Sequence, residues 1–155
     1  MAHLDLSDGK IKNVRAIIWR EEGGKRLFLI TQELSGHFTV PGGCKDSEDK
    51  DLETAIEREL REEIGLCPED YEISRIDWKG EYENSYHNPN SERYGKVTII
   101  YPFLVHTKVR GPFSVQAGEI KDAVWLSADD ARRALEYAPH MKDVFEVGLR
   151  QLDLG

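Results

Sequence analysis

Residues 41–66, PGGCKDSEDKDLETAIERELREEIGL, constrain this chain more than any other segment, because they predict a loop followed by a helix. Residues 52–64 contain strong helix formers and neither Gly nor Pro. Asp49 or Asp51 is expected to cap the helix, because an aspartate side chain accepts hydrogen bonds from the free N–H groups of a helix N-terminus. Gly65 is expected to end the helix, since glycine adopts the left-handed conformation at low cost.

This helix carries acidic side chains on the face that should pack against a core. At about 100° per residue, an apolar stripe is formed by Leu52, Ala55, Ile56, Leu60 and Leu66. Glu59 and Glu63 fall in the middle of the stripe, and Glu62 lies at its edge. A buried, unpaired carboxylate costs several kcal/mol or takes up a proton, and like charges at this spacing repel. A bound cation removes both problems, and carboxylate oxygens are ligands that Mg²⁺ and Mn²⁺ prefer.

A solvated acidic face is the alternative interpretation of the same helix. Ion pairs with Arg58 and Arg61 at helical spacing explain Glu57 well. They do not explain Glu59 and Glu63, which share a face with the apolar side chains.

The length of 155 residues predicts one domain, residues 1–155, with residues 1–10 as a polar lead-in that can be flexible. The chain is 39% hydrophobic and 32% charged, and no apolar run approaches the length of a membrane span. The N-terminus lacks the apolar segment of a signal peptide. We therefore expect a cytoplasmic protein without a membrane partner.

Cysteine content and net charge narrow the class of ligand. Cys44 and Cys67 lack the CxxC spacing of a zinc or redox motif, so reduced thiols are expected and a zinc site is not. The formal net charge of −8 argues against broad electrostatic binding of nucleic acid. A small anionic substrate is compatible with this charge, because a bound metal ion inverts the local sign.

The order of the remaining elements predicts an α+β or α/β layered domain with a mixed β-sheet and about three helices. Strands are expected at 11–20, 26–32, 37–40, 71–78, 96–107 and 119–126, and further helices at 128–137 and 141–152. The first two strands should form an antiparallel hairpin. Pro102 is expected to force a bulge or an edge position. Residues 80–95, with strand at their start, and 110–118 are expected to be loops.

Residues 41–66 resemble the Nudix box, G-x5-E-x7-R-E-U-x-E-E-x-G-U, in which U is aliphatic. The second half matches at Arg58, Glu59, Leu60, Glu62, Glu63, Gly65 and Leu66. The first half departs from the pattern, because Gly43 and Arg58 lie one residue too far apart. Counting back from Arg58, the position of the first Glu holds Lys50, between Asp49 and Asp51. We therefore expect a one-residue insertion in this loop and assign no role to the Lys50 position.

The resemblance to the Nudix hydrolase family, with its MutT-like members, implies an α/β/α sandwich in which the box forms a loop-helix-loop. It also implies hydrolysis of a phosphoanhydride bond in a nucleoside diphosphate linked to another moiety, with Mg²⁺ or Mn²⁺ as cofactor. Glu59, Glu62 and Glu63 are then the expected metal ligands, and Glu59 or Glu63 is expected to assist deprotonation of the attacking water. Arg58 is expected to orient a glutamate by hydrogen bonds, the alternative being an exposed ion pair.

Three further residues are candidates for metal or phosphate contact. Gly42 and Gly43 allow the backbone to approach phosphate or metal, and the Gly43 carbonyl is a candidate ligand; a tight turn explains both glycines equally. The resemblance implies an additional metal or base carboxylate at Glu119, for which a solvated loop acid is the alternative.

The region around residues 80–96 supplies the candidate substrate-binding side chains. Tyr82, Tyr86 and Tyr94 are candidates to stack on a nucleobase, and Arg93 and Lys96 are candidates to bind phosphates. The run SERYGKVTIIYPFLV is similar to the diadenosine tetraphosphate hydrolase branch, where a Lys opens a strand before a Tyr or Phe. Packing is the alternative role for a loop that bears tyrosines.

Three functional hypotheses follow from these patterns. The first is a metal-dependent Nudix pyrophosphohydrolase that acts on a small nucleotide, such as a dinucleoside polyphosphate or a nucleoside triphosphate. The second is a noncatalytic Nudix-fold module that binds a nucleotide or a protein; the altered loop at Lys50 favours it, and the retained glutamates oppose it. The third is an unrelated acidic domain with a structural helix. None of these patterns defines an oligomeric state.

Overall fold

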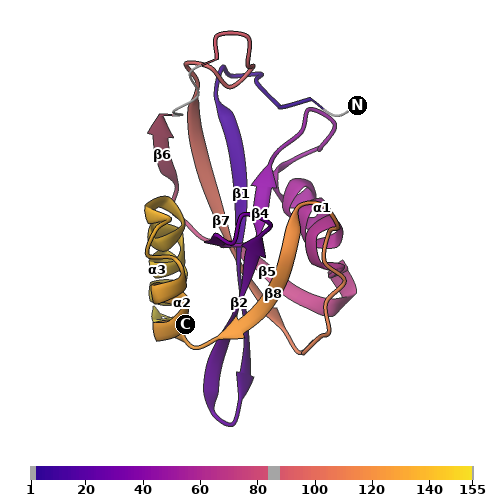
Figure 1. Ribbon diagram of the computed structural model, residues 1–155, viewed down its shortest axis with the longest axis vertical. Helices are drawn as coiled ribbons and strands as arrows, with labels where there is room; N and C mark the ends of the chain where they lie inside the picture. Colours follow the sequence, from indigo (N-terminus) through magenta and orange to yellow (C-terminus); the bar gives the residue numbers. More distant parts are fainter. Residues whose placement is uncertain (1–2, 84–87, 155) are drawn as a thin grey trace.

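Strand β1 (Ile11–Glu22) organises the sheet, because it pairs with neighbours along both of its edges. In the computed structural model, which describes residues 3–83 and 88–154, β1 runs parallel to β7 (Val97–Thr107) over residues 11–19. On its other edge it pairs antiparallel with β2 (Lys25–Glu33) and with β4 (Gly42–Cys44). The predicted hairpin is therefore confirmed, and the sheet is mixed (Figure 1).

The other strands extend the sheet in both directions. β3 (Phe38–Thr39) and β8 (Ile120–Leu126) pair antiparallel with β2. β5 (Tyr71–Arg75) and β6 (Gly80–Glu83) pair antiparallel with successive parts of β7. The strand expected at 71–78 is shorter than predicted, and β4 is a strand that the sequence analysis assigned to a turn.

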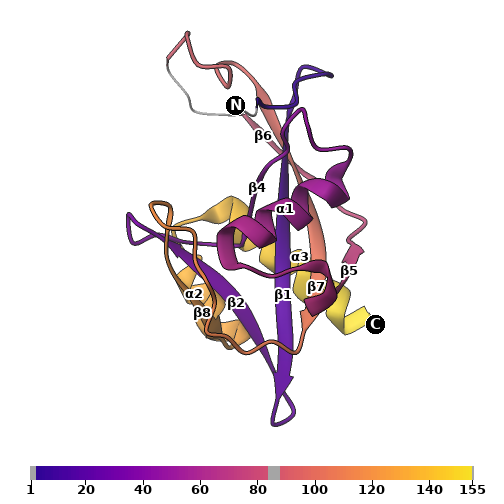
Figure 2. The same cartoon turned by 90° about the vertical axis from the view of Figure 1, so that its right-hand side faces the viewer.

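The sheet divides between β1 and β2, and this division makes room for the candidate site. The two strands pair only over residues 19–22 and 25–28, next to their hairpin turn. Beyond that point β2 diverges from β1 and carries β3 and β8 with it, while β4 takes its place beside β1 (Figure 2).

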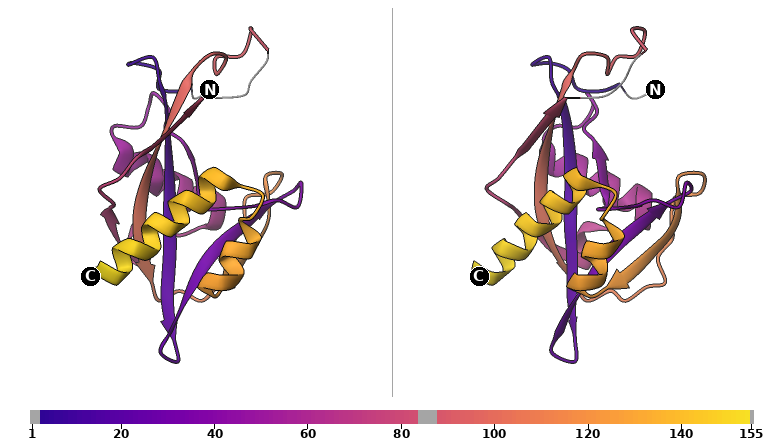
Figure 3. Two further views of the ribbon diagram at one scale, coloured as in Figure 1. Left: turned by 90° about the vertical axis from the view of Figure 1, so that its left-hand side faces the viewer. Right: turned by 60° about the vertical axis from the view of Figure 1, so that its left-hand side comes forward.

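Helices cover both faces of the sheet. Helix α1 (Leu52–Ile64) lies on one face, and α2 (Ala128–Ala134) and α3 (Pro139–Leu154) lie on the other (Figures 1 and 3). α1 has its predicted bounds: Asp51 caps it by accepting a hydrogen bond from the Thr54 N–H, and Gly65 ends it at φ 71°. α2 ends earlier and α3 begins earlier than predicted, and a short 3-10 helix, Pro68–Asp70, follows α1. No described helix is both long and apolar enough to cross a membrane.

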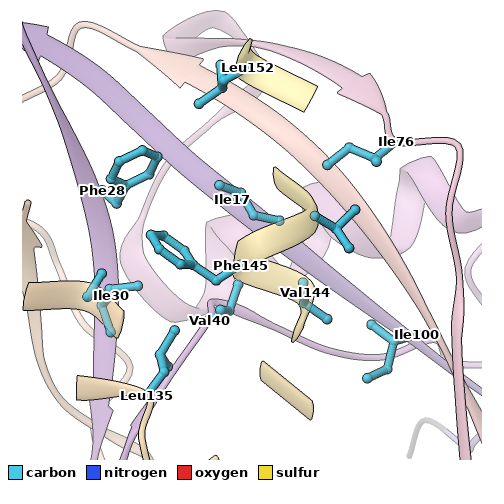
Figure 4. Close-up of a cluster of buried hydrophobic side chains, with 12 residues drawn as sticks. Ile17, Phe28, Ile30, Val40, Ile76, Ile100, Leu135, Val144, Phe145 and Leu152 are labelled. Atoms are coloured by element: carbon cyan, nitrogen blue, oxygen red, sulfur yellow. The ribbon is translucent and has the colours of Figure 1, made fainter. Parts of the chain in front are cut away.

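The alternation of β1 side chains supplies two hydrophobic cores. Ile17 faces α3, where Phe28 and Phe145 meet edge to face with ring centroids 5.0 Å apart (Figure 4). Val14, Ala16 and Ile18 face the opposite side and pack with Ile56, Leu60 and Ile64 of α1. Each core fixes the position of a helix relative to the strands, so α1 is held rigidly beside β1 and β4.

Pro102 lies within a central strand, so the expectation of a bulge or an edge position is wrong. It pairs in register with Arg15 of β1, and its carbonyl accepts a hydrogen bond from the Ile76 N–H on the other side. β5 ends at Arg75 and β6 begins at Gly80, so Pro102 falls opposite the gap between these strands. The missing N–H of proline therefore leaves no ladder partner unsatisfied.

The N-terminal segment is attached to the loop that precedes α1. Leu4 forms an isolated bridge with Asp46, and the Ser47 N–H donates to the His3 carbonyl. The Lys45 ammonium lies 2.6 Å from a carboxylate oxygen of Asp5, and this hydrogen bond holds the pKa of Asp5 well below its ordinary range. The lead-in residues that are described therefore contribute to the structure of the loop.

Candidate active site

Helix α1 presents two glutamates to a polar cavity of about 400 Å³ in the divided part of the sheet. β1 and β4 form one wall, and the start of β8 and the end of β2 form the other. The charged residues that line the cavity are Arg15, Glu33, Glu59, Glu63, Arg93 and Glu119. The cavity therefore brings together carboxylates and guanidinium groups from distant parts of the chain.

Glu63 is the most deeply buried acid of this site, with 7% of its surface exposed. One of its oxygens accepts a hydrogen bond from the Gly42 N–H at 2.8 Å. Burial raises the pKa of Glu63 to about 8, with Arg15 opposing this rise and Glu59 adding to it. Without a cation in the cavity, this carboxyl is therefore held in its protonated form near neutral pH.

Glu59 lies one turn before Glu63 and has a similar environment. Burial raises its pKa, and the charge of Arg58, whose Nη1 is 3.2 Å from Oε1, opposes the rise. The solvated-face interpretation is therefore wrong for Glu59 and Glu63, which turn toward the interior instead of toward bulk water.

Two glycines lie where the loop passes close to these acids. A Cβ on Gly43 would lie 2.5 Å from Oε1 of Glu59. A Cβ on Gly42, whose φ is +150°, would lie 2.0 Å from the Val14 carbonyl oxygen. The approach of Gly43 to the Glu59 carboxylate and of Gly42 to the backbone of β1, in addition to the turn, thus explains the Gly-Gly pair.

Arg58 ties the loop to the helix through several hydrogen bonds. Its Nε donates to Asp49 Oδ1 at 3.0 Å, and its Nη2 donates to Asp49 Oδ2 and to the Cys44 carbonyl, each at 3.0 Å. Its Nη1 donates to Glu59 and Glu62, each at 3.2 Å. Arg58 is therefore partly buried in a network, not an exposed ion pair.

The loop residue that pairs with Arg58 is Asp49, which precedes Lys50. Asp49 is the sixth residue after Gly43, which is the spacing of the first Glu in the box pattern, whereas Lys50 is exposed. The extra residue therefore lies between Asp49 and Arg58, after the acidic position. Burial alone would raise the pKa of Asp49, but hydrogen bonds from Arg58 and from the Asp46 N–H outweigh it and lower the pKa.

The remaining predicted metal ligands lie at different depths. Glu62 is half-exposed and turns toward Arg58, while Glu119 is exposed at the rim of the cavity. Among the described residues, no three His, Cys, Asp or Glu side chains are grouped closely enough to hold a metal ion alone. The carboxylates of Glu59 and Glu63 nevertheless fit Mg²⁺ or Mn²⁺, because such ions are commonly held by one or two carboxylates with water and substrate phosphates.

The predicted substrate-binding residues do not all converge. Arg93 lines the cavity, whereas Tyr94 and Lys96 do not. Tyr82 stacks on His140 of α3, with ring centroids 4.2 Å apart. Tyr86 lies outside the described residues.

Arg15 is a functional candidate that the sequence analysis missed. Its Nη1 donates to the Val40 carbonyl at 2.8 Å and its Nε to Asn13 Oδ1 at 2.6 Å, so the guanidinium is fixed in the wall of the cavity. The available signal was Asn13 and Arg15, polar residues at i and i+2 in a strand rich in branched side chains.

The mixed sheet, the helices on both of its faces and the loop-helix-loop that carries paired glutamates define the Nudix type of α/β/α domain. A family model described as NUDIX domain matches residues 9–147, so the chain belongs to this family. The predicted fold class is confirmed.

Individual relatives are distant. The chain is similar to the mouse U8 snoRNA-decapping enzyme, with 33% identity over 54 residues, which are 35% of this chain and 28% of the length of that relative. Its fold is similar to that of a C. elegans Ap4A hydrolase in a binary complex, with 22% identity, a TM-score of 0.74 and coverage of 94% of this chain and 99% of that one. It is also similar to a MutT protein from Methanosarcina mazei, with 23% identity, a TM-score of 0.67 and coverage of 92% and 94%.

Proposed function

We propose that this chain uses Mg²⁺ or Mn²⁺ to hydrolyse a phosphoanhydride bond in a nucleoside diphosphate linked to another moiety. The observation that carries the proposal is a pair of glutamates, the buried Glu63 and the partly buried Glu59, that face a cavity also lined by Arg15 and Arg93. Two adjacent carboxylates need a cation, and two arginines at the same cavity suit a polyphosphate.

Each of these residues has a definite task in this proposal. Glu59 and Glu63 hold the ion, and one of them accepts the proton of the attacking water. Arg15, held by Val40 and Asn13, and Arg93 bind phosphate oxygens. The ion, when bound, neutralises phosphate charge and acidifies water.

A dinucleoside polyphosphate is the first substrate to test. The fold likeness to an Ap4A hydrolase supports it, as does the sequence similarity of residues 91–105 to that branch. Hydrolysis of diadenosine tetraphosphate with one water to ATP and AMP would support this assignment, whereas release of pyrophosphate from nucleoside triphosphates would replace it. The likeness to a decapping enzyme adds a capped RNA to the panel.

A Glu63→Gln variant tests the hydrolase itself. Loss of the carboxylate should lower kcat by roughly 100-fold or more across the panel, since proton transfer and metal binding depend on it. Glu57→Gln makes the same chemical change on the same helix, outside the cavity, and should retain activity. Wild-type protein that turns over no nucleotide with either ion would refute the proposal.

The noncatalytic alternative loses its main support. It depended on the loop at Lys50, where the box acid had seemed to be missing. Asp49 occupies the spacing of that acid and forms a two-pronged pair with Arg58. Tight nucleotide binding without turnover remains the result that would favour a binding module.

A further inference from the structure

Lys45, in the loop between β4 and α1, is a buried lysine with 7% of its surface exposed. A buried ammonium group is costly unless an acid and further hydrogen-bond acceptors surround it. The Nζ of Lys45 lies 2.6 Å from Asp5 Oδ2 and 3.4 Å from the Asp46 carbonyl oxygen. Asp5 belongs to the N-terminal segment, which lies beside this loop (Figure 1), so the acid that pairs with Lys45 comes from outside the loop.

The Asp5 carboxylate is fixed in the position from which it meets Lys45. Its Oδ1 accepts a hydrogen bond from the Ser7 N–H at 3.0 Å and lies 3.7 Å from Lys12 Nζ. The Asp5 N–H also donates to the Lys45 carbonyl at 3.1 Å. Asp5 and Lys45 are therefore joined twice, through their side chains and through their backbones.

A second acid of the same loop, Asp49, lies within reach of the Lys45 charge. Against the effect of burial, Arg58 lowers the pKa of Asp49, and the charge of Lys45 adds to this lowering. Asp49 nevertheless binds Arg58 through both of its carboxylate oxygens. The loop thus holds two cations and two acids that are paired in one way, Lys45 with Asp5 and Arg58 with Asp49.

A different pairing would change the surroundings of Glu59. The Arg58 guanidinium is held by Asp49 and by the Cys44 carbonyl, and its Nη1 then lies 3.2 Å from Glu59 Oε1. If Lys45 took Asp49 as its partner, the guanidinium would pair more closely with Glu59 and compete with a cation for that carboxylate.

We propose that Asp5 is a positioning residue for the active site. By occupying Lys45, it leaves Asp49 to Arg58. Arg58 then keeps its geometry, and the Glu59 carboxylate stays available to the metal ion. Asp5 does not line the polar cavity, so it acts on the reaction only through the loop. The inference rests on the proposed function, because that function gives Glu59 the task of holding the ion.

An Asp5→Asn variant tests this role, because the amide keeps the shape of the side chain and removes its charge. With the nucleotide that the wild type hydrolyses, kcat should fall by about 10- to 100-fold, the range found when a residue that supports a metal ligand is lost. The Mg²⁺ concentration that gives the half-maximal rate should rise. KM for the nucleotide should be unchanged, since Arg15 and Arg93 keep their places.

Asp8→Asn is the matched control. It makes the same chemical change in the same segment and removes a carboxylate that binds Lys12 at 2.9 Å without contact to the loop before α1. Asp8→Asn should keep the kinetics of the wild type. Equal kinetics of Asp5→Asn and Asp8→Asn would overturn the proposal.

A second substitution, Lys45→Met in the Asp5→Asn protein, shows whether the effect passes through Lys45. Methionine fills the buried space with an unbranched apolar side chain and removes the ammonium that would compete for Asp49. kcat and the Mg²⁺ requirement should return to the wild-type range. A folded double variant as slow as Asp5→Asn would overturn the proposal, and this result is decisive even where Asp5→Asn alone does not fold.

Two measurements do not depend on turnover. Without nucleotide, the affinity for Mn²⁺, followed by electron paramagnetic resonance of the free ion, should weaken by about 10- to 100-fold in Asp5→Asn and recover in the double variant. In the metal-free protein, the NMR signal of the Arg58 Nε–H, assigned by its absence from Arg58→Lys, should shift in Asp5→Asn and return in the double variant. An Arg58 signal that does not respond to Asp5→Asn would contradict the exchange of partners.

Failure of this inference is distinguishable from failure of the proposed function. Turnover that requires Glu63 but is insensitive to Asp5→Asn would refute only the positioning role. The expected Mn²⁺ and Arg58 responses in a protein that hydrolyses no nucleotide would refute only the hydrolysis.

Discussion

In the metal-free protein, Glu63→Gln should be more stable than the wild type at alkaline pH. Glu63 is buried beside Glu59, and its pKa is raised from 4.5 to about 8, chiefly by burial. A glutamine of the same shape cannot ionise, so it avoids the cost of a buried charge while keeping an oxygen for the Gly42 N–H.

The sign and size of the effect follow from proton linkage. The unfolded chain releases the Glu63 proton near pH 4.5, while the native state keeps it up to about pH 8. In this window the native state binds more protons, so the contribution of Glu63 to stability is fully present below pH 4.5 and is lost as pH rises toward 8. One pKa unit corresponds to about 1.4 kcal/mol, so the loss is on the order of 5 kcal/mol above the window and about 3 kcal/mol at pH 7.

Urea unfolding measures this prediction. Wild type and Glu63→Gln, both stripped of metal with a chelator, are unfolded at a series of pH values across the window. The difference in free energy of unfolding should shift by several kcal/mol in favour of the variant as pH rises. Glu57→Gln, a partly exposed position of the same helix, serves as the control for the loss of one acidic side chain.

Added Mg²⁺ provides the second half of the test. At alkaline pH the ion should stabilise the wild type by RT ln(1 + [Mg²⁺]/Kd) and should stabilise Glu63→Gln much less. A wild-type-to-variant difference that does not change with pH would refute the reasoning, because it would mean that the Glu63 carboxylate is solvated in the native protein.

Three other substitutions test the loop and the packing. Gly43→Ala should lower kcat by roughly 100-fold, because its methyl group would displace the Glu59 carboxylate; steady-state kinetics with unchanged circular dichroism measures this. Arg58→Lys should reduce the free energy of unfolding by about 1–3 kcal/mol, since an ammonium cannot reproduce the two-pronged bond to Asp49; urea titration tests it, and an unchanged midpoint contradicts it. Gly148→Ala should cost about 1–3 kcal/mol by overpacking α3 against β1, and a raised melting temperature would contradict this.

The sequence predicted helix α1 and the glutamates on its apolar face well, because both depend on local rules. Helix propensity and an aspartate cap determine the bounds of α1, and helical periodicity places Glu59 and Glu63 on the apolar face. Neither property requires knowledge of distant contacts.

Other features of the fold and the site were not predicted, because they depend on contacts between residues that lie far apart in the sequence. Pro102 is tolerated in a central strand only because β5 and β6 leave a gap opposite it. The choice of Asp49 over Lys50 depends on where the loop meets Arg58, and a count in one direction cannot locate an inserted residue. The position of Arg15 in the cavity wall depends on β4 beside β1, a pairing between residues that lie far apart in the sequence.

The attachment of residues 3–5 to the loop before α1 has a practical consequence for producing this protein. His3, Leu4 and Asp5 contact residues 45–47, and the same loop supplies Gly42, Gly43 and Asp49 to the site. A truncation that removes residues 3–5 would therefore weaken the support of the loop, and the resulting loss of activity would resemble a catalytic defect. Leu154 is exposed at the other end of the chain, so a fusion placed there leaves the support of the loop intact.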